Sequence, residues 1–429
     1  MLSKAIILAT IAMLILIFLK VPVFVSMMSG AMVYFCMEPA ATLQIAAQRL
    51  TSGMESVSIL AAPFFIFTGV MMNRCGVTER VMDFCALVTG RLYGGLAQTN
   101  ILLSTVMGGM SGSSIADAAM ESKILVPEME KQGLPKPFSA VVTAFSSIIT
   151  PLIPPGIGMI LYGTLAKVSV GSLFMAGLWI GSFCCISMMV MTSVISHKKQ
   201  YMPLRTERMR WKQFWPVFKR AFFPLMLIVI IIGGIRIGVF TPSEAGAVAV
   251  IYTIILGLCY KELTRENFIG AFVECAITTG GIMLIIGAAN IYAWALTKDQ
   301  VPQALSAMML SIISNKYVFL LIVNIFLLIV GMFMEGCAAT VILAPILAPL
   351  AAAYGIDPIH MGMVFTLNLS VGVISPPVGA VLYVTCGVTN CKIKDFMKAS
   401  VPYFLYLLGV LLFFSYIPLF IHIPFLSIA

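Results

Sequence analysis

The chain has 429 residues, of which 60% are apolar and only 10% are charged, whereas soluble globular proteins carry about 25% charged residues. A soluble fold of this length could not cover so much apolar surface, so the composition excludes a soluble protein and indicates a polytopic membrane protein. The net charge of +9 is typical of lysines and arginines gathered on the cytoplasmic side of a membrane, and we expect no nucleic-acid partner.

A membrane-spanning helix needs about 20 apolar residues, and the apolar segments predict an all-α protein. In chain order, the predicted helices cover residues 3–19, 22–37, 56–73, 95–110, 137–167, 170–196, 221–239, 242–259, 273–296, 317–334, 358–388 and 396–421. The shorter segments 111–126 and 337–353 follow tight turns of small residues. They predict the returning arms of two re-entrant hairpins, at 95–126 and 317–353. Residues 197–220 form the one strongly polar stretch and are interpreted as a basic cytoplasmic connector.

Two of the predicted helices, 137–167 and 358–388, are interrupted by paired prolines. Proline removes a backbone donor and clashes with the preceding turn, so each helix must break there. At membrane depth such a break is tolerated only where the freed backbone groups meet protein, ions or water. The breaks are therefore predicted to be functional.

The two breaks belong to an internal repeat. Pro154-Pro155 is matched 222 positions later by Pro376-Pro377. The hairpin turns "GGMSGSSIADAA" and "GMFMEGCAATVI" match in the same order, as do "VPVFVSMMSGAMVYF" and "GVFTPSEAGAVAVIY". We therefore predict two repeats, at 1–200 and 221–429. Within them, the helices expected to form a fixed scaffold lie in 3–73 and 221–296. With the connector inside, 20 of the 26 lysines and arginines fall on the cytoplasmic side, which makes the repeats inverted.

Inverted repeats with broken helices in matching positions indicate a secondary transporter. A broken helix exposes carbonyl oxygens, which suit a cation such as Na⁺, and N–H groups, which suit a carboxylate. In the first half, the tip Ser111–Ser114 is paired with the break from Thr150 to Pro155. In the second half, the tip Glu335–Ala338 is paired with the break from Gly372 to Pro377. Further side-chain oxygens come from Thr340, Asn368 and Ser375.

Three carboxylates within these segments have more than one interpretation. Glu335 is either a functional intramembrane charge or a helix-start carboxylate that complements the helix dipole. Asp117 and Glu121 follow the first tip at helical spacing. They either face an aqueous path or pair with Lys123, and the sequence does not decide between the two.

Catalytic patterns are missing from the sequence. The three histidines (His197, His360 and His422) are far apart and none sits in an H-E-x-x-H arrangement, while the ten cysteines show no metal-site spacing. No P-loop for ATP is present. We therefore expect neither an enzyme, nor a transition-metal site, nor an organic cofactor.

Several stretches carry a resemblance to a known family. They are "PFFIFTGVMMNRCGVTERV", "GGMSGSSIADAA", "SSIITPLIPPGIGMILYG", "GVFTPSEAGAVAVIY", "LAPILAPLAAAYGIDPIHMGMVFTLNL" and "SPPVG". Together they resemble the large membrane subunit of tripartite ATP-independent periplasmic (TRAP) transporters, from about residue 5 to residue 420. The resemblance implies a Na⁺-driven elevator importer in the bacterial inner membrane, in which a transport domain slides past a fixed scaffold. It also implies two partners, a small four-helix membrane subunit, expected here as a separate chain, and a periplasmic substrate-binding protein.

The resemblance also implies where ligands bind. It places the first Na⁺ site at Ser111, Gly112, Ser113, Ser114, Thr150, Ile153 and Pro155. It places the second at Glu335, Gly336, Cys337, Thr340, Gly372, Ser375 and Pro377. The predicted substrate contacts are Ser113, Pro154, Gly156, Asn368, Pro376 and Gly379. The family often has Gly where this chain has Thr150 and Thr where it has Ser375, which leaves the ligand sets open.

The leading hypothesis is thus Na⁺-coupled uptake of an organic acid whose identity the sequence does not give. A stand-alone dicarboxylate or citrate carrier with a related elevator fold is the alternative within the same class. An intramembrane enzyme lacks the residues it needs, and a purely structural subunit would tolerate bulky replacements at Ser113 or Ser375.

Overall fold

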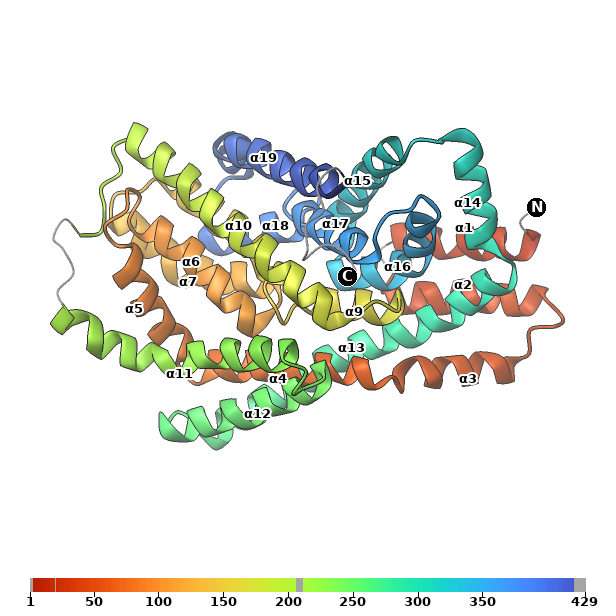
Figure 1. The fold of residues 1–429 in the computed structure, drawn as a ribbon, viewed down its shortest axis with the longest axis horizontal. Coiled ribbons are helices and arrows are strands. Elements are labelled where there is room, and N and C mark those ends of the chain that lie inside the picture. Colours follow the sequence, from red (N-terminus) through yellow and green to blue (C-terminus); the bar gives the residue numbers. More distant parts are fainter. Residues whose placement is uncertain (1–2, 20, 206–210, 420–429) are drawn as a thin grey trace.

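A computed structural model describes residues 3–19, 21–205 and 211–419, so positions 206–210 of the predicted connector and 420–421 of the last predicted helix lie outside the described residues. All regular elements in the described ranges are helices (Figure 1). Those of the first half are α1 (Lys4–Phe18), α2 (Val23–Met37), α3 (Leu43–Met54), η1 (Val57–Leu60), α4 (Ala61–Arg74), α5 (Val77–Thr89), α6 (Leu96–Ser111), α7 (Ser114–Lys131), α8 (Lys136–Ser146), η2 (Ser147–Leu152), α9 (Ile157–Leu165) and α10 (Val170–Lys198).

The second half follows with a similar order of elements. These are α11 (Trp211–Arg236), α12 (Pro242–Cys259), α13 (Arg265–Lys298), α14 (Val301–Ile312), α15 (Lys316–Phe333), α16 (Gly336–Ala353), α17 (Pro358–Gly372), α18 (Ala380–Thr389), α19 (Ile393–Tyr416) and η3 (Ile417–Leu419). Among the described residues, eight helices are long and apolar enough to cross a membrane. The all-helical membrane fold predicted from composition is confirmed.

Both helix breaks are present where the paired prolines predicted them. In the first half, α8 tightens into the 3₁₀ helix η2, and the chain is irregular from residue 153 to residue 156 before α9 begins. In the second half, irregular backbone from 373 to 379 separates α17 from α18. The Pro154-Pro155 and Pro376-Pro377 peptide bonds are both cis.

The hairpins pack against the broken helices in a pattern that is the same in both halves. Each first arm contacts the broken helix of its own half: α6 packs on α8 and η2, and α15 packs on α17. Each returning arm contacts the restarted helix of the opposite half, so that α7 packs on α18 and α16 packs on α9. Figure 1 shows α9, α17 and α18 near the middle of the molecule, with α6 and α7 on one side of them and α15 and α16 on the other. This exchange of partners is what a two-fold relation between the halves produces.

Three helices were missed by the sequence analysis, namely α3, α5 and α14. All three mix polar with apolar residues, so a search for continuous apolar segments passes over them. In α5, the buried positions include Val77, Val81, Cys85 and Thr89, which recur every fourth residue as on one face of an amphipathic helix. That spacing is the signal by which α5 could have been predicted.

Two helix boundaries were also placed too late. The predicted helix 221–239 begins at Trp211 as α11, so part of the polar connector is helical. The predicted helix 273–296 begins at Arg265 as α13, where the hydroxyl of Thr264 accepts a hydrogen bond from the backbone N–H of Asn267. In both cases a polar turn continues the helix beyond its apolar part, and hydropathy alone cannot locate its start.

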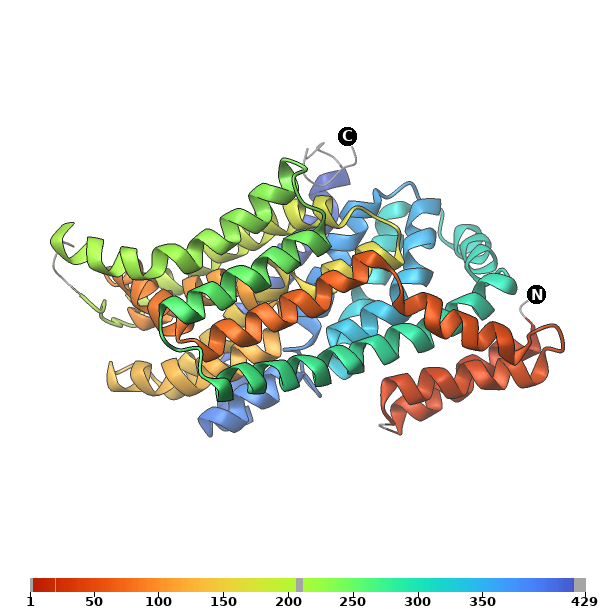
Figure 2. The same cartoon turned by 90° about the horizontal axis from the view of Figure 1, so that it is seen from below.

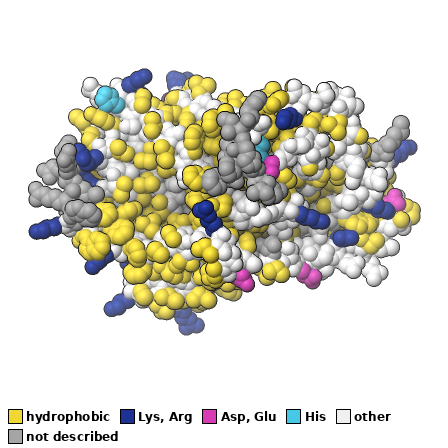
Figure 3. Space-filling view, viewed as in Figure 1, with side chains coloured by type: hydrophobic (Ala, Val, Ile, Leu, Met, Phe, Trp, Pro, Cys, Tyr) yellow, Lys and Arg dark blue, Asp and Glu magenta, His cyan; other side chains and the backbone are white. Residues whose placement is uncertain are grey.

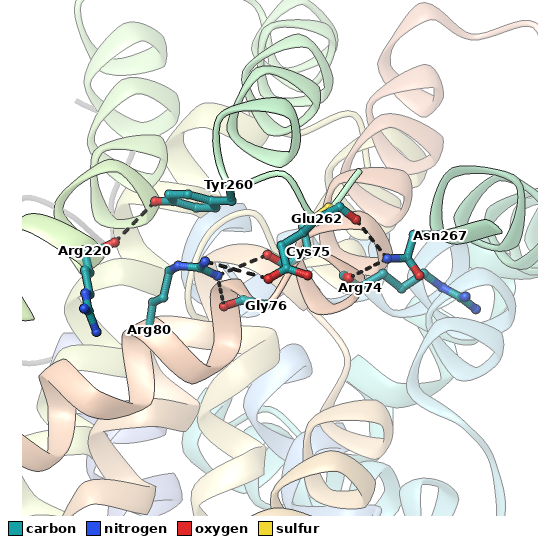
Figure 4. Close-up of polar contacts among 8 residues, drawn as sticks. All are labelled: Arg74, Cys75, Gly76, Arg80, Arg220, Tyr260, Glu262 and Asn267. Atoms are coloured by element: carbon teal, nitrogen blue, oxygen red, sulfur yellow. Dashed lines mark hydrogen bonds and ion pairs between the residues drawn. The ribbon is translucent and has the colours of Figure 1, made fainter. Parts of the chain in front are cut away.

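The scaffold helices α4, α12 and α13 lie side by side, and Figure 2 shows α4 between the other two. At one end of this layer, the α4–α5 turn meets the α12–α13 turn (Figure 4). There the Arg80 guanidinium donates to the carbonyl oxygen of Gly76 at 2.7 Å and lies 4.0 Å from the Tyr260 ring centre. It also lies 3.9 Å from a Glu262 carboxylate oxygen. The basic residues of the two turns therefore lie at the same end of the scaffold layer, and the assignment of that end to the cytoplasmic side stays a prediction.

The outer surface is strongly apolar. Figure 3 shows apolar side chains over much of the visible face. On α10 the exposed large apolar side chains include Trp179, Phe183, Ile186, Val190 and Val194. Burial of such side chains in hydrocarbon is favourable, so these surfaces fit contact with the lipid bilayer.

Candidate ion- and substrate-binding site

A cavity of about 210 Å³ lies where the two hairpin tips meet the two broken helices. The first half contributes Gly112, Ser113, Ser114, Ile115, Pro151, Ile157 and Gly158. The second half contributes Glu335, Gly336, Cys337, Thr340, Thr366, Leu369, Ser370 and Val373, together with Thr278 and Ile282 of α13. Segments that are more than 200 residues apart in sequence thus form one site.

In the first half, the hairpin approaches the break closely through glycines. Gly112 links α6 to α7 with a φ of +61°, a left-handed conformation that suits glycine. A Cβ atom at Gly112 would lie 2.9 Å from the carbonyl oxygen of Pro155. One at Gly108 would lie 3.0 Å from the carbonyl oxygen of Thr150 and 2.9 Å from the Cβ of Ile153. Of the predicted carbonyl ligands, that of Pro155 therefore lies beside the tip and that of Thr150 beside Gly108 of α6.

The second half repeats this arrangement with other residues. Gly331 and Gly372 pack backbone to backbone, since a Cβ on Gly331 would lie 2.9 Å from the Cα of Gly372. Thr340 donates its hydroxyl hydrogen to the carbonyl oxygen of Gly336 at 2.7 Å, and Ser375 donates to that of Val371 at 2.9 Å. Hydroxyls held in this way keep their oxygen lone pairs available to a ligand.

Each returning arm begins with a side-chain cap that faces the cavity. The Ser113 hydroxyl accepts from the Ala116 N–H at 3.4 Å, and the Glu335 carboxylate accepts from the Ala338 N–H at 3.4 Å. Glu335 is thus a helix-start carboxylate, which was one of its two interpretations. Because the side chain is also exposed and lines the cavity, the functional interpretation stays open as well.

Not every predicted residue lines the cavity. The lining does not include Ser111, Thr150, Ile153, Pro154, Pro155 and Gly156 of the first half, nor Gly372, Ser375, Pro376, Pro377 and Gly379 of the second, of which Pro376 and Pro377 are exposed. Asn368 is fully buried, and its amide donates to the side chain of Asn324 on α15 at 2.6 Å. The amide nitrogen of Asn368 is therefore engaged by α15 and α17, whereas its side-chain oxygen is buried without a hydrogen-bond partner. The ligand roles of all these residues remain predictions.

The lining also contains residues that the sequence analysis missed. Thr278 and Ile282 lie on α13, which no motif linked to the hairpins. They are four positions apart and so share one face of the helix. Thr366 and Ser370 of α17 show the same spacing, and this pair of hydroxyls next to a predicted break could have been noticed.

The cavity contains almost no charged side chains. Glu335 is the single charged residue among its described lining residues, which include no Lys, Arg or His. Helix N-termini point into this region at Ser114 and Gly336, and α9 begins at Ile157 with no side-chain cap. Such N-termini carry about half a positive charge each. Positive potential in the cavity therefore comes from the backbone.

Asp117 and Glu121 lie behind the first tip, and the structure bears out neither of their two interpretations, an aqueous path or an ion pair with Lys123. Both are buried, while Lys123 is exposed, so neither carboxylate pairs with that lysine. Instead, Asp117 accepts a hydrogen bond from the Thr150 hydroxyl at 2.9 Å, and Glu121 accepts one from the Ser104 hydroxyl at 2.6 Å. Neither residue lines the cavity.

Comparison with known proteins identifies the family. Residues 10–420 match the family model described as the tripartite ATP-independent periplasmic transporter, DctM component. The chain belongs to this family. The resemblance stated from the hairpin and proline motifs is confirmed, and homologous members are named as transporter permeases rather than enzymes.

Curated relatives match over nearly their whole length. The sialic acid TRAP transporter large permease protein SiaM of Vibrio cholerae is 37% identical, with 94% of this chain and 95% of that protein covered. The 2,3-diketo-L-gulonate TRAP transporter large permease protein YiaN of Escherichia coli is 36% identical, with 89% and 90% covered. The C4-dicarboxylate TRAP transporter large permease protein DctM of Pseudomonas aeruginosa is 35% identical, with 91% of each covered.

A solved structure shares the fold at low identity. The YdaH transporter of Alcanivorax borkumensis superposes with a TM-score of 0.60 over 90% of each chain, at 15% identity. At this identity the likeness concerns the fold alone.

Proposed function

We propose that this chain is the permease of a Na⁺-coupled importer of an organic carboxylate. The observation that carries the proposal is the cavity between two hairpin tips and two broken helices, whose described lining has no basic side chain. An anion there needs positive charge from helix N-termini and from co-bound cations. The backbone carbonyl of Pro155 lies beside the first tip and that of Thr150 beside Gly108 of α6, and oxygen ligands suit a hard cation. Na⁺ and carboxylate therefore stabilise each other.

The movement that we propose is an elevator motion of the hairpins and broken helices along α13. Its support is that Thr278 and Ile282 of α13 form the only wall of the described cavity outside the hairpins and broken helices.

The partners of the chain are proposed on the family relationship. They are a separate small four-helix membrane subunit, which would lie beside this chain in the bacterial inner membrane, and a periplasmic substrate-binding protein. Relatives are named for sialic acid, 2,3-diketo-L-gulonate and C4-dicarboxylates, and the cargo of this chain is proposed to be a carboxylate of this general kind. The family relationship favours this tripartite system over the stand-alone carrier.

The test is uptake into proteoliposomes that contain the chain with its small subunit and receptor. Radiolabelled succinate and sialic acid serve as probes, with inward gradients of NaCl or of choline chloride. We expect uptake of one probe that requires both the receptor and the Na⁺ gradient. Uptake that continues at the same rate in choline would contradict Na⁺ coupling, and uptake without receptor or small subunit would favour the stand-alone carrier.

A further inference from the structure

A second group of buried polar residues lies within the first hairpin, behind the tip. Asp117 and Glu121 stand one turn apart on α7, with 2% and 1% of their surface exposed. Ser104 of α6 and Thr150 of η2 face them from two other elements. Neither carboxylate is among the cavity-lining residues, so the proposed transport site does not use them.

Each carboxylate accepts a hydrogen bond from a hydroxyl that also has a second acceptor nearby. The Ser104 hydroxyl donates to Glu121 Oε2 at 2.6 Å, and the hydroxyl oxygen of Ser146 lies 3.0 Å from it. The Thr150 hydroxyl donates to Asp117 Oδ2 at 2.9 Å, and the carbonyl oxygen of Ser104 lies 3.3 Å from it. Because a hydroxyl carries one hydrogen, each can satisfy one of its two acceptors at a time.

The surrounding residues do not make up the shortage of donors. Ser146 directs its hydroxyl to the Asn100 side-chain oxygen or to the Thr143 carbonyl oxygen, both at 3.0 Å. The Asn100 amide donates to the Thr143 hydroxyl at 2.6 Å. Two carboxylate oxygens, Asp117 Oδ1 and Glu121 Oε1, remain buried without any hydrogen-bond partner. The group therefore holds more acceptors than hydrogens.

Positive charge is also missing. The five ion pairs in the described part of the chain involve Glu274, Glu262, Glu128, Glu130 and Glu38, and neither Asp117 nor Glu121. A buried carboxylate without a positive partner is strongly unfavourable, and two of them one turn apart also repel each other. The folded chain consequently requires that a bound cation or a proton neutralise this pair.

We propose that Asp117 and Glu121 bind a hard monovalent cation, Na⁺, at a third site separate from the two at the hairpin tips. The available ligands are carboxylate, hydroxyl and carbonyl oxygens from α6, α7 and η2, which is the donor chemistry of hard cations. The two orphan oxygens supply the unfilled positions. This inference goes beyond the proposed transport function, since it concerns cation binding by the chain alone.

The experiment measures equilibrium binding of ²²Na⁺ to the full-length chain in lipid nanodiscs, with choline chloride keeping the ionic strength constant. The double variant Asp117→Asn with Glu121→Gln is expected to bind one Na⁺ per chain fewer than the unmodified protein. Glu128→Gln is the matched control, because Glu128 lies on the same helix but is exposed and pairs with Lys131. Its Na⁺ stoichiometry is expected to be unchanged.

Ser104→Ala provides a variant that leaves the charge intact. It removes the hydroxyl that donates to Glu121, and we expect unchanged stoichiometry with several-fold weaker binding. Equal Na⁺ stoichiometry in the unmodified protein and the folded double variant would overturn the proposal.

If the double variant fails to fold, infrared difference spectra of the unmodified protein decide. If saturating Na⁺ removes a protonated-carboxyl band, or if no such band is present in saturating Na⁺, the result supports binding of a cation by the pair. A protonated-carboxyl band that persists in saturating Na⁺ and is missing from Glu121→Gln shows that a proton neutralises the pair, which also overturns the proposal. These readouts need no substrate or partner, so a failure of Na⁺-coupled uptake would be recognised separately.

Discussion

The carbonyl oxygen of Pro155 lies so close to Gly112 that a Cβ atom on that glycine would approach it to 2.9 Å. Gly112 also has a φ of +61°, which costs about 1–2 kcal/mol for other residues. Gly112→Ala is therefore expected to lower the melting temperature. It is also expected to reduce Na⁺ affinity, because the added Cβ would push the Pro155 carbonyl oxygen away from the tip. Gly409→Ala is the control, since a Cβ there meets nothing within 4 Å and Gly409 lies in neither predicted ion site. Equal Na⁺ affinity in both variants, measured by ²²Na⁺ binding, would contradict the role given to this contact.

Thr340 tests the second ion site. Its hydroxyl donates to the Gly336 carbonyl at 2.7 Å and lines the cavity, so its lone pairs are free for Na⁺. Thr340→Val removes the oxygen at nearly constant shape, and we expect the Na⁺ concentration for half-maximal uptake to rise about tenfold, which corresponds to the loss of about 1.4 kcal/mol. Thr340→Ser keeps the oxygen and should stay close to the unmodified protein. A Val variant with unchanged Na⁺ dependence would remove Thr340 from the site.

Cys337 reports occupancy of the cavity directly. Its thiol is partly exposed and lines the cavity, while Cys36 and Cys259 are exposed elsewhere. In a chain with Cys36→Ser and Cys259→Ser, a small methanethiosulfonate reagent is expected to modify Cys337. Saturating Na⁺ should slow this reaction several-fold relative to choline, because an ion at the tip blocks access. Mass spectrometry of the labelled peptide measures the rate, and an identical rate in the two salts would argue against an ion beside Cys337.

Arg80 tests the contact between the two scaffold turns. It donates to the Gly76 carbonyl, stacks on Tyr260 and lies near Glu262, so Arg80→Gln is expected to cost about 1–3 kcal/mol in the free energy of unfolding. Arg80→Lys keeps the charge without the planar group and should restore only part of this. Reversible unfolding in mixed micelles measures the difference.

Arg74→Gln is the matched control for Arg80. The Arg74–Glu274 ion pair is 2.8 Å long, but its side chains are 37% and 53% exposed, and exposed pairs contribute little. We expect a change within about 0.5 kcal/mol. A loss as large as that of Arg80→Gln would show that the two turns are held by charge alone.

The sequence predicted those parts of the fold that require particular residue types, such as proline at a helix break or small residues at a tight turn. Paired prolines can only interrupt a helix, and the tips at Gly112 and Gly336 follow from small residues between apolar arms, so both hairpins and both breaks were located. The amphipathic helices α3, α5 and α14 have no long apolar run, and their stability depends on packing against other helices. A search for continuous apolar segments therefore missed them.

The site was predicted to a similar depth. Ser113 and Glu335 were found because they stand at the tips themselves. Thr278 and Ile282 were not, because a residue on a distant helix reaches the cavity only through the packing of α13 against α16. The contact of Asp117 with Thr150 was undecidable for the same reason, since burial and partner choice are properties of the assembled helices.

Because α13 contributes only a short stretch of the cavity wall, the side chains that face the cavity depend on where the hairpins stand along this helix. A displacement of the hairpins by one turn, about 5.4 Å, would replace the facing pair Thr278 and Ile282. Towards one end the facing pair would become Glu274 and Thr278, and towards the other Ile282 and Ile286. A cargo carried along α13 would therefore pass a carboxylate, then a hydroxyl and then aliphatic side chains. Its solvation would change at each step.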